Sequence, residues 1–276
     1  MLRVGTCGFS YREWVGPFYP FGIRQQAMLD YYARRFAAVE IDSTYYAIPK
    51  PALFESMAHR TPEEFRFTVK APGSITHVPA EAEPAADDIV AFHECLTPLL
   101  RSRKLGAVLA QFPNAFRPGR QAFARLELLR REWPELRLVA EFRHRDWQKD
   151  AVLRILRGLD IGWCNVDEPA FDTLMRPDER TTSTIGYVRF HGRNAAKWWC
   201  QERSSAERYD YLYTHDELVE WLPRIAEIGD RTDETYVFFN NHRNGQAAVN
   251  ARQMMELLDI APPEVLESER QLKLLD

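Results

Sequence analysis

The sequence predicts an α/β protein built as a single (β/α)8 TIM-like barrel. Eight short runs of β-branched or apolar residues recur along the 276 residues, and all but the first, which ends at Gly8, end at a polar residue. Their starting points lie 24 to 49 residues apart, which leaves room in each gap for the helix that joins two parallel strands. A doubly wound sheet is the alternative, but no GxGxxG turn follows the first run.

The expected strands follow one another at regular intervals. They are Arg3–Gly8, Val39–Asp42, Phe65–Lys70, Leu105–Gln111, Leu136–Arg143, Gly162–Asp167, Gly186–His191 and Thr235–Asn240. Strands that alternate with helices over about 250 residues are typical of a (β/α)8 barrel.

Helical periodicity is present in several of the gaps between these strands. Three stretches contain mainly apolar residues three or four positions apart, as on one face of a helix. They are Leu29, Tyr32, Ala33 and Phe36; Ile89, His93, Leu96 and Leu100; and Val152, Ile155, Leu156 and Leu159. The segment Thr214–Glu217 has the pattern of a capping box and predicts a helix start. Pro223 should kink or divide the helix that follows.

The composition is that of a globular protein and argues against several functional classes. Hydrophobic residues make up 45% of the chain, which is too many for a disordered protein. The formal net charge of −4 lacks the cationic excess of proteins that bind phosphate backbones, so a nucleic-acid partner is not expected. No apolar run approaches the roughly 20 residues of a membrane span.

We interpret the chain as one domain, residues 1–276, with residues 259–276 as a C-terminal extension. No secretory signal pattern is visible, and the four cysteines Cys7, Cys95, Cys164 and Cys200 are widely spaced without a CxxC pair. Both features predict a cytoplasmic protein with reduced thiols. The oligomeric state stays open.

Polar side chains collect where the expected strands end. In a barrel these ends form one face, and the βα loops on that face hold the working site. The residues are Glu40 with Asp42, Lys70, Gln111, Glu141 with Arg143, Asp167, Arg189 with His191, and Asn240 with Asn241. Residues two positions apart share one face of a strand, so these pairs should point together into the barrel mouth.

Charged side chains of both signs should therefore meet in this mouth. The acidic residues Glu40, Glu141 and Asp167 stand against the basic residues Lys70, Arg143 and Arg189. Removing a charge from water is costly, so these groups must pair, bind a ligand or hold a metal. An ionic plug that only closes the barrel is the alternative interpretation.

The last two βα loops favour an anionic ligand. They carry Arg193 and Arg243, and Gly245 precedes an expected helix near Ala247. Cationic side chains beside a helix N-terminus form the phosphate site of many barrels. Gly245 can equally serve only as a turn residue with positive φ.

Aromatic residues are concentrated in the same loops. Tyr45 follows the second strand, and Trp198 and Trp199 lie in the seventh loop. Their rings could stack on a sugar or a nucleobase, or they could pack on one another as a lid. For the aromatic residues of the first loop, between residues 9 and 19, we favour the packed lid.

A divalent metal is a further hypothesis. Glu141, Asp167 and His191 lie on three successive strands and offer ligands that Zn²⁺ or Mn²⁺ accepts. No compact motif such as HExxH supports the site, and His191 can instead orient a neighbour or transfer a proton. We interpret Cys7, at the end of the first strand, as a buried small side chain rather than a nucleophile.

Seven groups of motif residues follow one another along nearly the whole chain. They are Gly5–Tyr11, Glu40–Tyr46, Val69–Pro72 with Ile75–His77, Gln111–Pro113, Glu141–His144 with Trp147, Tyr187–Gly192, and Phe239–Asn241 with Gly245–Ala247 and Asn250–Ala251. Together they resemble the YecE-like family, domain of unknown function 72. The resemblance implies a TIM-like barrel and a cytoplasmic protein of bacterial type, but no activity. Cys7 and Phe9 depart from the family pattern, in which serine and tryptophan are common.

The leading hypothesis is an enzyme that performs hydrolytic or acid–base chemistry on a small anionic or sugar-like substrate. Glu141 would act as general base or metal ligand with Asp167 as its partner, and His191 would transfer a proton. Lys70 and Arg143 would stabilise developing negative charge. The substrate-binding residues would be Glu40, Asp42, Tyr45, Gln111, Arg189, Arg193, Trp198, Trp199, Asn240, Asn241 and Arg243. The alternative is a non-catalytic barrel that binds or senses a small molecule within a complex.

Overall fold

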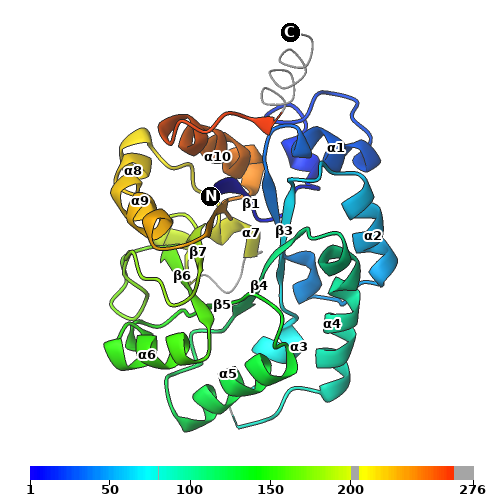
Figure 1. The fold of residues 1–276 in the computed structure, drawn as a ribbon. Coiled ribbons are helices and arrows are strands. Elements are labelled where there is room, and N and C mark those ends of the chain that lie inside the picture. The colour runs from blue at the N-terminus through cyan, green and yellow to red at the C-terminus, as the bar shows by residue number, and fades with distance from the viewer. Residues whose placement is uncertain (80, 200–204, 264–276) are drawn as a thin grey trace.

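Eight parallel strands form the centre of the molecule, and helices surround them (Figure 1). The computed structural model describes residues 1–79, 81–199 and 205–263. The strands are β1 (Leu2–Thr6), β2 (Ala38–Ile41), β3 (Arg66–Lys70), β4 (Leu105–Gln111), β5 (Leu138–Glu141), β6 (Ile161–Asp167), β7 (Ile185–Phe190) and β8 (Glu234–Phe239). Each lies within one of the eight expected runs or extends it by one residue, so the predicted (β/α)8 fold is confirmed.

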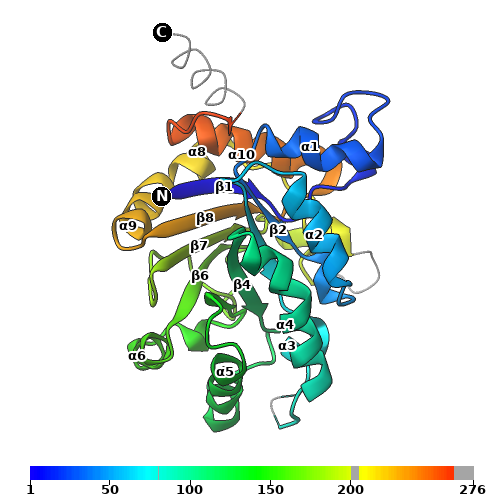
Figure 2. The same cartoon turned by 45° about the vertical axis from the view of Figure 1, so that its right-hand side comes forward.

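The strands form a nearly closed ring in the order β1-β8-β7-β6-β5-β4-β3-β2. Figure 2 shows β1, β8, β7 and β6 lying one after another in this order. The ring closes between β1 and β2, where Gly8 N donates to Glu40 O at 2.7 Å and Cys7 pairs with Glu40. Gly5 permits this approach, because a Cβ atom there would lie 2.1 Å from Ala38 O.

The helices cover the outside of the ring. They are α1 (Met28–Ala33), α2 (Pro51–His59), α3 (Gly73–Thr76), α4 (Ala86–Arg101), α5 (Arg120–Glu132), α6 (Asp150–Gly158), α7 (Ser205–Arg208), α8 (His215–Val219), α9 (Leu222–Asp230) and α10 (Gln246–Leu257). Single turns of 3-10 helix lie at Arg12–Trp14, Gln25–Ala27, Ser43–Tyr45, Arg145–Trp147, Ala195–Lys197 and Arg243–Gly245. The three predicted helical stripes fall on, or directly after, α1, α4 and α6.

The predicted capping box and helix division are both present. Thr214 and Glu217 exchange the two hydrogen bonds of a capping box at the start of α8. This helix ends at Val219, and α9 begins at Leu222 with Pro223 in its first turn. Proline is tolerated there because its missing N–H has no helical partner in any case.

The connection between β6 and β7 differs from the expected pattern. Residues 168–184, all of which the structure describes, contain no helix. Asn165 of β6 fixes this connection instead, since its side chain accepts from Arg180 N and donates to Arg180 O, each at 3.0 Å. A side chain therefore satisfies backbone groups that a crossover helix would otherwise pair.

The structure bears on three further expectations, which concern the cysteines, a membrane span and the C-terminal extension. Cys7, Cys95 and Cys164 are free and buried, whereas Cys200 lies outside the described residues. No helix within the described ranges is long and apolar enough to cross a bilayer. Residues 264–276 of the expected C-terminal extension also lie outside the described residues.

Candidate functional site

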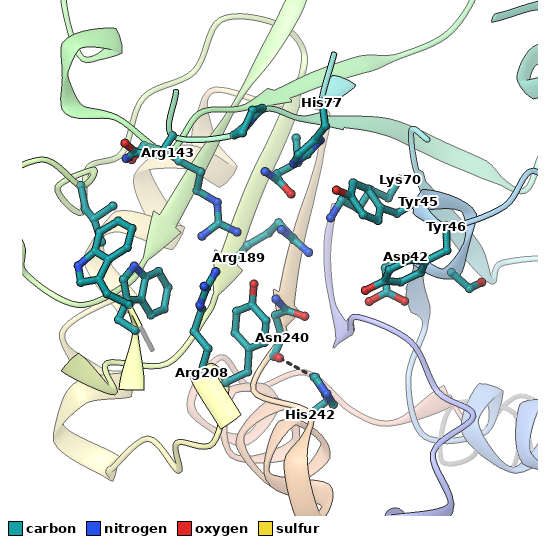
Figure 3. Close-up of a pocket in the computed structure, with 18 of the residues that line it drawn as sticks. Asp42, Tyr45, Tyr46, Lys70, His77, Arg143, Arg189, Arg208, Asn240 and His242 are labelled. Atoms are coloured by element: carbon teal, nitrogen blue, oxygen red, sulfur yellow. Dashed lines mark hydrogen bonds between the residues drawn. The ribbon is translucent and has the colours of Figure 1, made fainter. Parts of the chain in front are cut away.

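A cavity of about 550 Å³ opens where the strands end, among the βα loops (Figure 3). This is the end at which barrels hold their working sites. The described residues that line it are Tyr11, Asp42, Ser43, Tyr45, Tyr46, Lys70, His77, Gln111, Pro113, Asn114, Arg143, Leu174, Arg189, Trp198, Trp199, Arg208, Tyr209, Asn240 and His242. The sequence-predicted site residues brought together here are Asp42, Tyr45, Lys70, Gln111, Arg143, Arg189, Trp198, Trp199 and Asn240.

Alternation along the strands decides which side chains face inward. Arg189 contacts Glu40 and Glu141 across the barrel, so all three point into it. Phe142 points the other way and stacks on Trp147 with ring centroids 3.8 Å apart. The two-residue period read from the sequence therefore agrees with the structure at β2, β5 and β7.

Arg189 joins two carboxylates beneath the cavity. Its Nη2 lies 2.6 Å from Glu40 Oε1, and its Nη1 lies 2.5 Å from Glu141 Oε2. Tyr187 OH donates to the other oxygen of Glu40 at 2.7 Å. Both carboxylates are fully buried and neither lines the cavity. Glu40 and Glu141 therefore act as counter-ions behind the cavity wall.

Glu141 is also held by Arg143 and His191. Arg143 Nε lies 2.7 Å and His191 Nε2 lies 3.2 Å from the same oxygen, Glu141 Oε1. Burial alone would raise the pKa of Glu141, but Arg143 and Arg189 outweigh burial and hold it well below its usual value. A carboxylate so firmly ionised has little tendency to take up a proton, so these contacts do not favour the predicted general base.

His191 is fully buried between Glu141 and Asn240. Burial, followed by the charge of Arg143, lowers the pKa of His191 to about 3, so the ring is neutral. Asn240 Nδ2 lies 3.1 Å from Nδ1, and this pairing assigns the ring proton to Nε2, facing Glu141. Because His191 does not line the cavity, its contacts fit a positioning residue better than the predicted proton donor.

Arg143 lines the cavity and joins Glu141 to Glu168. Its Nη1 donates to Glu168 Oε2 at 3.1 Å, and the other oxygen of Glu168 accepts from Met175 N at 3.0 Å. Burial raises the pKa of Glu168 to about 7, and Arg143 acts in the opposite direction. Sequence reasoning missed Glu168 and selected its neighbour Asp167.

Asp167 is the clearest difference from the predicted site. Arg193 contacts both of its oxygens at 2.8 to 3.2 Å. Tyr213 OH and Trp221 Nε1 each donate to it at 2.7 Å. Asp167 is fully buried, does not line the cavity and directs its carboxylate to Arg193, Tyr213 and Trp221, so its contacts do not favour the predicted partnership with Glu141. Its contacts anchor the loop that follows β7 and the segment between α8 and α9.

The predicted anion site in the last two βα loops is not assembled from the expected arginines. Arg193 is occupied by Asp167 and by Glu220, whose Oε2 lies 2.9 Å from Nη2. Arg243 Nη1 lies 3.4 Å from a carboxylate oxygen of Asp210. Neither arginine lines the cavity, because carboxylates from other parts of the fold hold both of them.

Asn241 and Gly245 have structural roles in these loops. Asn241 is buried, and its Nδ2 donates to Tyr211 O and to Asn250 Oδ1, each at 2.8 Å. Gly245 has a φ of 77° directly before α10, which is the turn role that the sequence left open. The sequence predicted that Asn241 binds the substrate, but Asn241 does not line the cavity.

Lys70, at the end of β3, has few partners. In the part of the chain that the structure describes it forms no ion pair, and its Nζ lies 4.4 Å from the ring centre of Tyr45. Thr44 Oγ1 donates to Lys70 O at 2.6 Å and fixes the backbone. Burial, followed by the charge of Arg189, lowers the pKa of Lys70 to about 8.

Arg208 and His77 also line the cavity, although the sequence analysis gave neither of them a site role and named His77 only within a motif group. The Arg208 guanidinium lies 5.6 Å from the ring centre of Trp198. Burial, followed by the charge of Lys70, lowers the pKa of His77 to about 4. Neither residue directly follows a strand, so a search of strand ends could not find them. Trp199 is 52% exposed at the rim and Trp198 is buried.

The aromatic cluster of the first loop packs on itself, as favoured from the sequence. Trp14, Phe18 and Tyr19 are buried, and the rings of Trp14 and Phe18 meet edge to face at 5.7 Å. Tyr11 extends from this cluster to the cavity and stacks on His242 at 5.0 Å. The cluster thus supports one wall of the site.

The three candidate metal ligands do not converge. Glu141 and His191 contact each other, but Asp167 faces Arg193. Within the described ranges, no group of three or more His, Cys, Asp or Glu side chains is placed to hold a metal ion. Cys7 is fully buried, and burial followed by the charge of Glu40 raises its thiol pKa well above the usual value, as expected of an inert side chain.

Comparison with known sequences identifies the family of this barrel. The family model described as "Protein of unknown function DUF72" matches residues 3–273. The chain belongs to the DUF72 family. The UPF0759 protein YunF of Bacillus subtilis (strain 168) is 32% identical to it over 280 residues, which cover 94% of this chain and 95% of that protein.

Solved DUF72 structures share the fold. A DUF72 family protein from Thermotoga maritima MSB8 is 40% identical, with a TM-score of 0.86 over 94% of this chain and 99% of that chain. Another from Enterococcus faecalis V583 is 28% identical, with a TM-score of 0.83 over 95% and 96% of the two chains. These descriptions name no activity, so the chemistry of this DUF72 site is inferred from its own residues.

Proposed function

We propose that this DUF72 protein is an enzyme that binds a small anionic substrate, phosphorylated or carboxylated, and acts on it by acid–base chemistry. One observation carries the proposal. The described residues that line the cavity include the cations Lys70, Arg143, Arg189 and Arg208 but a single carboxylate, Asp42. The carboxylates that pair with Arg143 and Arg189 lie behind the wall, so the surface offered to a ligand is cationic.

An ionic plug explains only part of this arrangement. It accounts for Arg143 and Arg189, which buried carboxylates hold in place. It does not account for Lys70 and Arg208, which form no ion pair with any described residue. A partly buried charge without a counter-ion is costly, and an anionic ligand would offset that cost. The amides of Gln111, Asn114 and Asn240 and the aromatic walls would orient the rest of the ligand.

Proton transfer is assigned to Lys70 in this proposal. Lys70 lines the cavity, and its pKa of about 8 leaves part of the amine neutral and able to accept a proton near neutral pH. Hydrolysis is one form of this chemistry, in which Lys70 would deprotonate the attacking water, while His77, whose pKa of about 4 keeps its ring neutral, would offer a hydrogen bond to the ligand. Glu141 and His191 would position Arg143, Arg189 and Asn240 without touching the substrate.

A barrel that binds a ligand without turnover is the second candidate. It is favoured by the complete burial of Glu40 and Glu141, since neither carboxylate lines the cavity and neither can act there as a base or nucleophile on a bound ligand. A screen of phosphorylated and carboxylated compounds separates the candidates, because only an enzyme forms product. We also propose a cytoplasmic location, which the free thiols of Cys7, Cys95 and Cys164 support.

The substitution Arg208→Gln should weaken the binding of inorganic phosphate about tenfold, because a charge-assisted hydrogen bond is lost. Isothermal titration calorimetry of the wild type and the variant measures this change. Arg243→Gln is the matched control, since Arg243 pairs with Asp210 and does not line the cavity. Equal losses in both variants, or a wild type that does not bind phosphate, would contradict the proposal.

A further inference from the structure

We propose that Lys70 is a nucleophile that forms an imine with a carbonyl substrate carrying an anionic group. This inference rests on the proposed function, because the cationic cavity would hold the anionic group. It adds a substrate class and a covalent step. Lysine amines perform such chemistry when they are partly desolvated and lie near another cation.

Lys70 is the one lysine among the described residues that line the cavity. The other cations there are arginines, whose guanidinium groups stay protonated and do not form imines. Elsewhere, Lys104 Nζ is buried and donates to Ala58 O and Thr61 O, each at 2.6 Å, and Lys197 Nζ lies 3.5 Å from Asp210. Lys70 Nζ, by contrast, forms no hydrogen bond or ion pair with a described residue.

The surroundings of Lys70 favour a neutral amine. Its side chain is half-buried, with Nζ over the ring of Tyr45. The charged groups around it are Arg189, Glu141, Glu40 and Asp42, and His77 lies close enough to feel its charge. Burial and then Arg189 have the largest influence and lower the pKa to about 8, so an appreciable fraction of the amine is unprotonated near neutral pH.

The cavity offers two separate points of attachment. Figure 3 shows Arg143 and Arg208 directed toward one part of the cavity, whereas Lys70 enters from the side of Tyr45 and Arg189 lies between them. A ligand whose anionic group binds the arginines can therefore present a carbonyl group to Lys70. A volume of about 550 Å³ suits a ligand of this size.

The covalent step balances without an oxidant or reductant. The lone pair of neutral Nζ attacks the carbonyl carbon, the π bond to oxygen breaks, and a proton passes from nitrogen to oxygen to give a carbinolamine. The carbon–oxygen bond then breaks, and the hydroxyl group leaves as water with a proton from a cavity acid, so a protonated imine remains. Asp42 suits this role, because burial, followed by the charge of Glu40, raises the pKa of its carboxyl group.

Pyridoxal 5′-phosphate is a suitable probe, since it joins an aldehyde to a phosphate group. After incubation with the full chain, borohydride reduction should fix the probe on Lys70 as a secondary amine, which peptide mass spectrometry locates among the six lysines. Near pH 8, Lys70 should be labelled about tenfold faster than the exposed Lys149, because the cavity holds the phosphate beside a partly neutral amine. Labelling of Lys70 should rise with pH and level off above about 8.

Matched variants and probes separate covalent chemistry from simple binding. The Lys70→Arg variant keeps the positive charge, but an arginine cannot form an imine, so position 70 should not be labelled. The Lys149→Arg variant should still be labelled on Lys70. Pyridoxine 5′-phosphate, which has an alcohol in place of the aldehyde, should bind and slow the labelling. Pyridoxal without phosphate should label Lys70 more slowly than the phosphorylated probe.

Three outcomes would contradict the proposal that Lys70 forms an imine. Calorimetric binding of pyridoxine 5′-phosphate without labelling of Lys70 would refute the covalent step and leave the proposed anion site intact. Equal labelling of Lys70 and Lys149 would refute a dedicated nucleophile. Neither binding nor labelling would refute the anion site and the imine together.

Discussion

Replacement of Arg189 by methionine is expected to lower the free energy of unfolding by about 3–5 kcal/mol at neutral pH. Arg189 is 1% exposed and holds Glu40 at 2.6 Å and Glu141 at 2.5 Å. Its removal leaves two buried carboxylates with too few partners, whereas the methionine side chain preserves much of the packing. Urea denaturation of the wild type and Arg189→Met measures the difference.

The dependence of this loss on pH tests its cause. In the wild type the folded-state pKa of Glu141 is lowered, so its contribution to stability is fully present above the unfolded pKa of about 4.3. That contribution is lost as the pH falls through the folded-state pKa. The difference between the wild type and Arg189→Met should therefore shrink progressively below about pH 4.

A second variant checks which charge is left unpaired. Glu141 keeps Arg143 and His191 when Arg189 is replaced, but Glu40 then has no ion pair with a described residue and keeps the neutral groups of Tyr187 and Cys7. The double variant Glu40→Gln/Arg189→Met should therefore recover part of the lost stability. A loss below about 1 kcal/mol in Arg189→Met, or a loss that is constant with pH, would contradict a shared counter-ion.

Asp167→Ala is expected to destabilise the fold by about 3 kcal/mol and to leave phosphate binding by the folded protein unchanged. The variant removes the acceptor of Arg193, Tyr213 and Trp221, and Arg193 keeps a partner in Glu220. Urea denaturation measures the stability, and phosphate titration by calorimetry measures the binding.

An exposed aspartate provides the control for Asp167. Asp172 pairs with Arg176 at 3.4 Å and is almost fully exposed, so Asp172→Ala should change the stability by less than about 0.5 kcal/mol. If Asp167→Ala keeps its stability but loses phosphate binding, Asp167 acts at the ligand site and the anchoring role is wrong.

Strand periodicity was the most informative part of the sequence. Buried parallel strands appear in the sequence as continuous apolar runs, and seven of the eight runs here end at a polar residue, so all eight strands could be located. The two-residue period then placed Glu40, Glu141 and Arg189 on the inward face. Local spacing was sufficient because these side chains lie at strand ends, where position in the chain fixes position in the barrel.

The failures arose where distant contacts decide the outcome. Every residue of β6 is buried, so the order of polar and apolar residues did not reveal which face each side chain occupies. Asp167 faces outward to Trp221, and Glu168 faces inward to Arg143. Arg193 looked available for an anion, but Glu220, from a later part of the fold, lies 2.9 Å away. Arg208 lies in a helix after the seventh strand, and nothing in its local sequence places it at the cavity.

The functional proposals all depend on an anionic group binding to Arg143, Arg189 and Arg208. A crystal structure of the protein soaked with saturating pyridoxine 5′-phosphate shows where such a group binds. We expect phosphate oxygens within hydrogen-bond distance of at least two of these guanidinium groups. Phosphate bound instead to Arg193 and Arg243, or none in the cavity under these conditions, would show that the cavity is not the anion site.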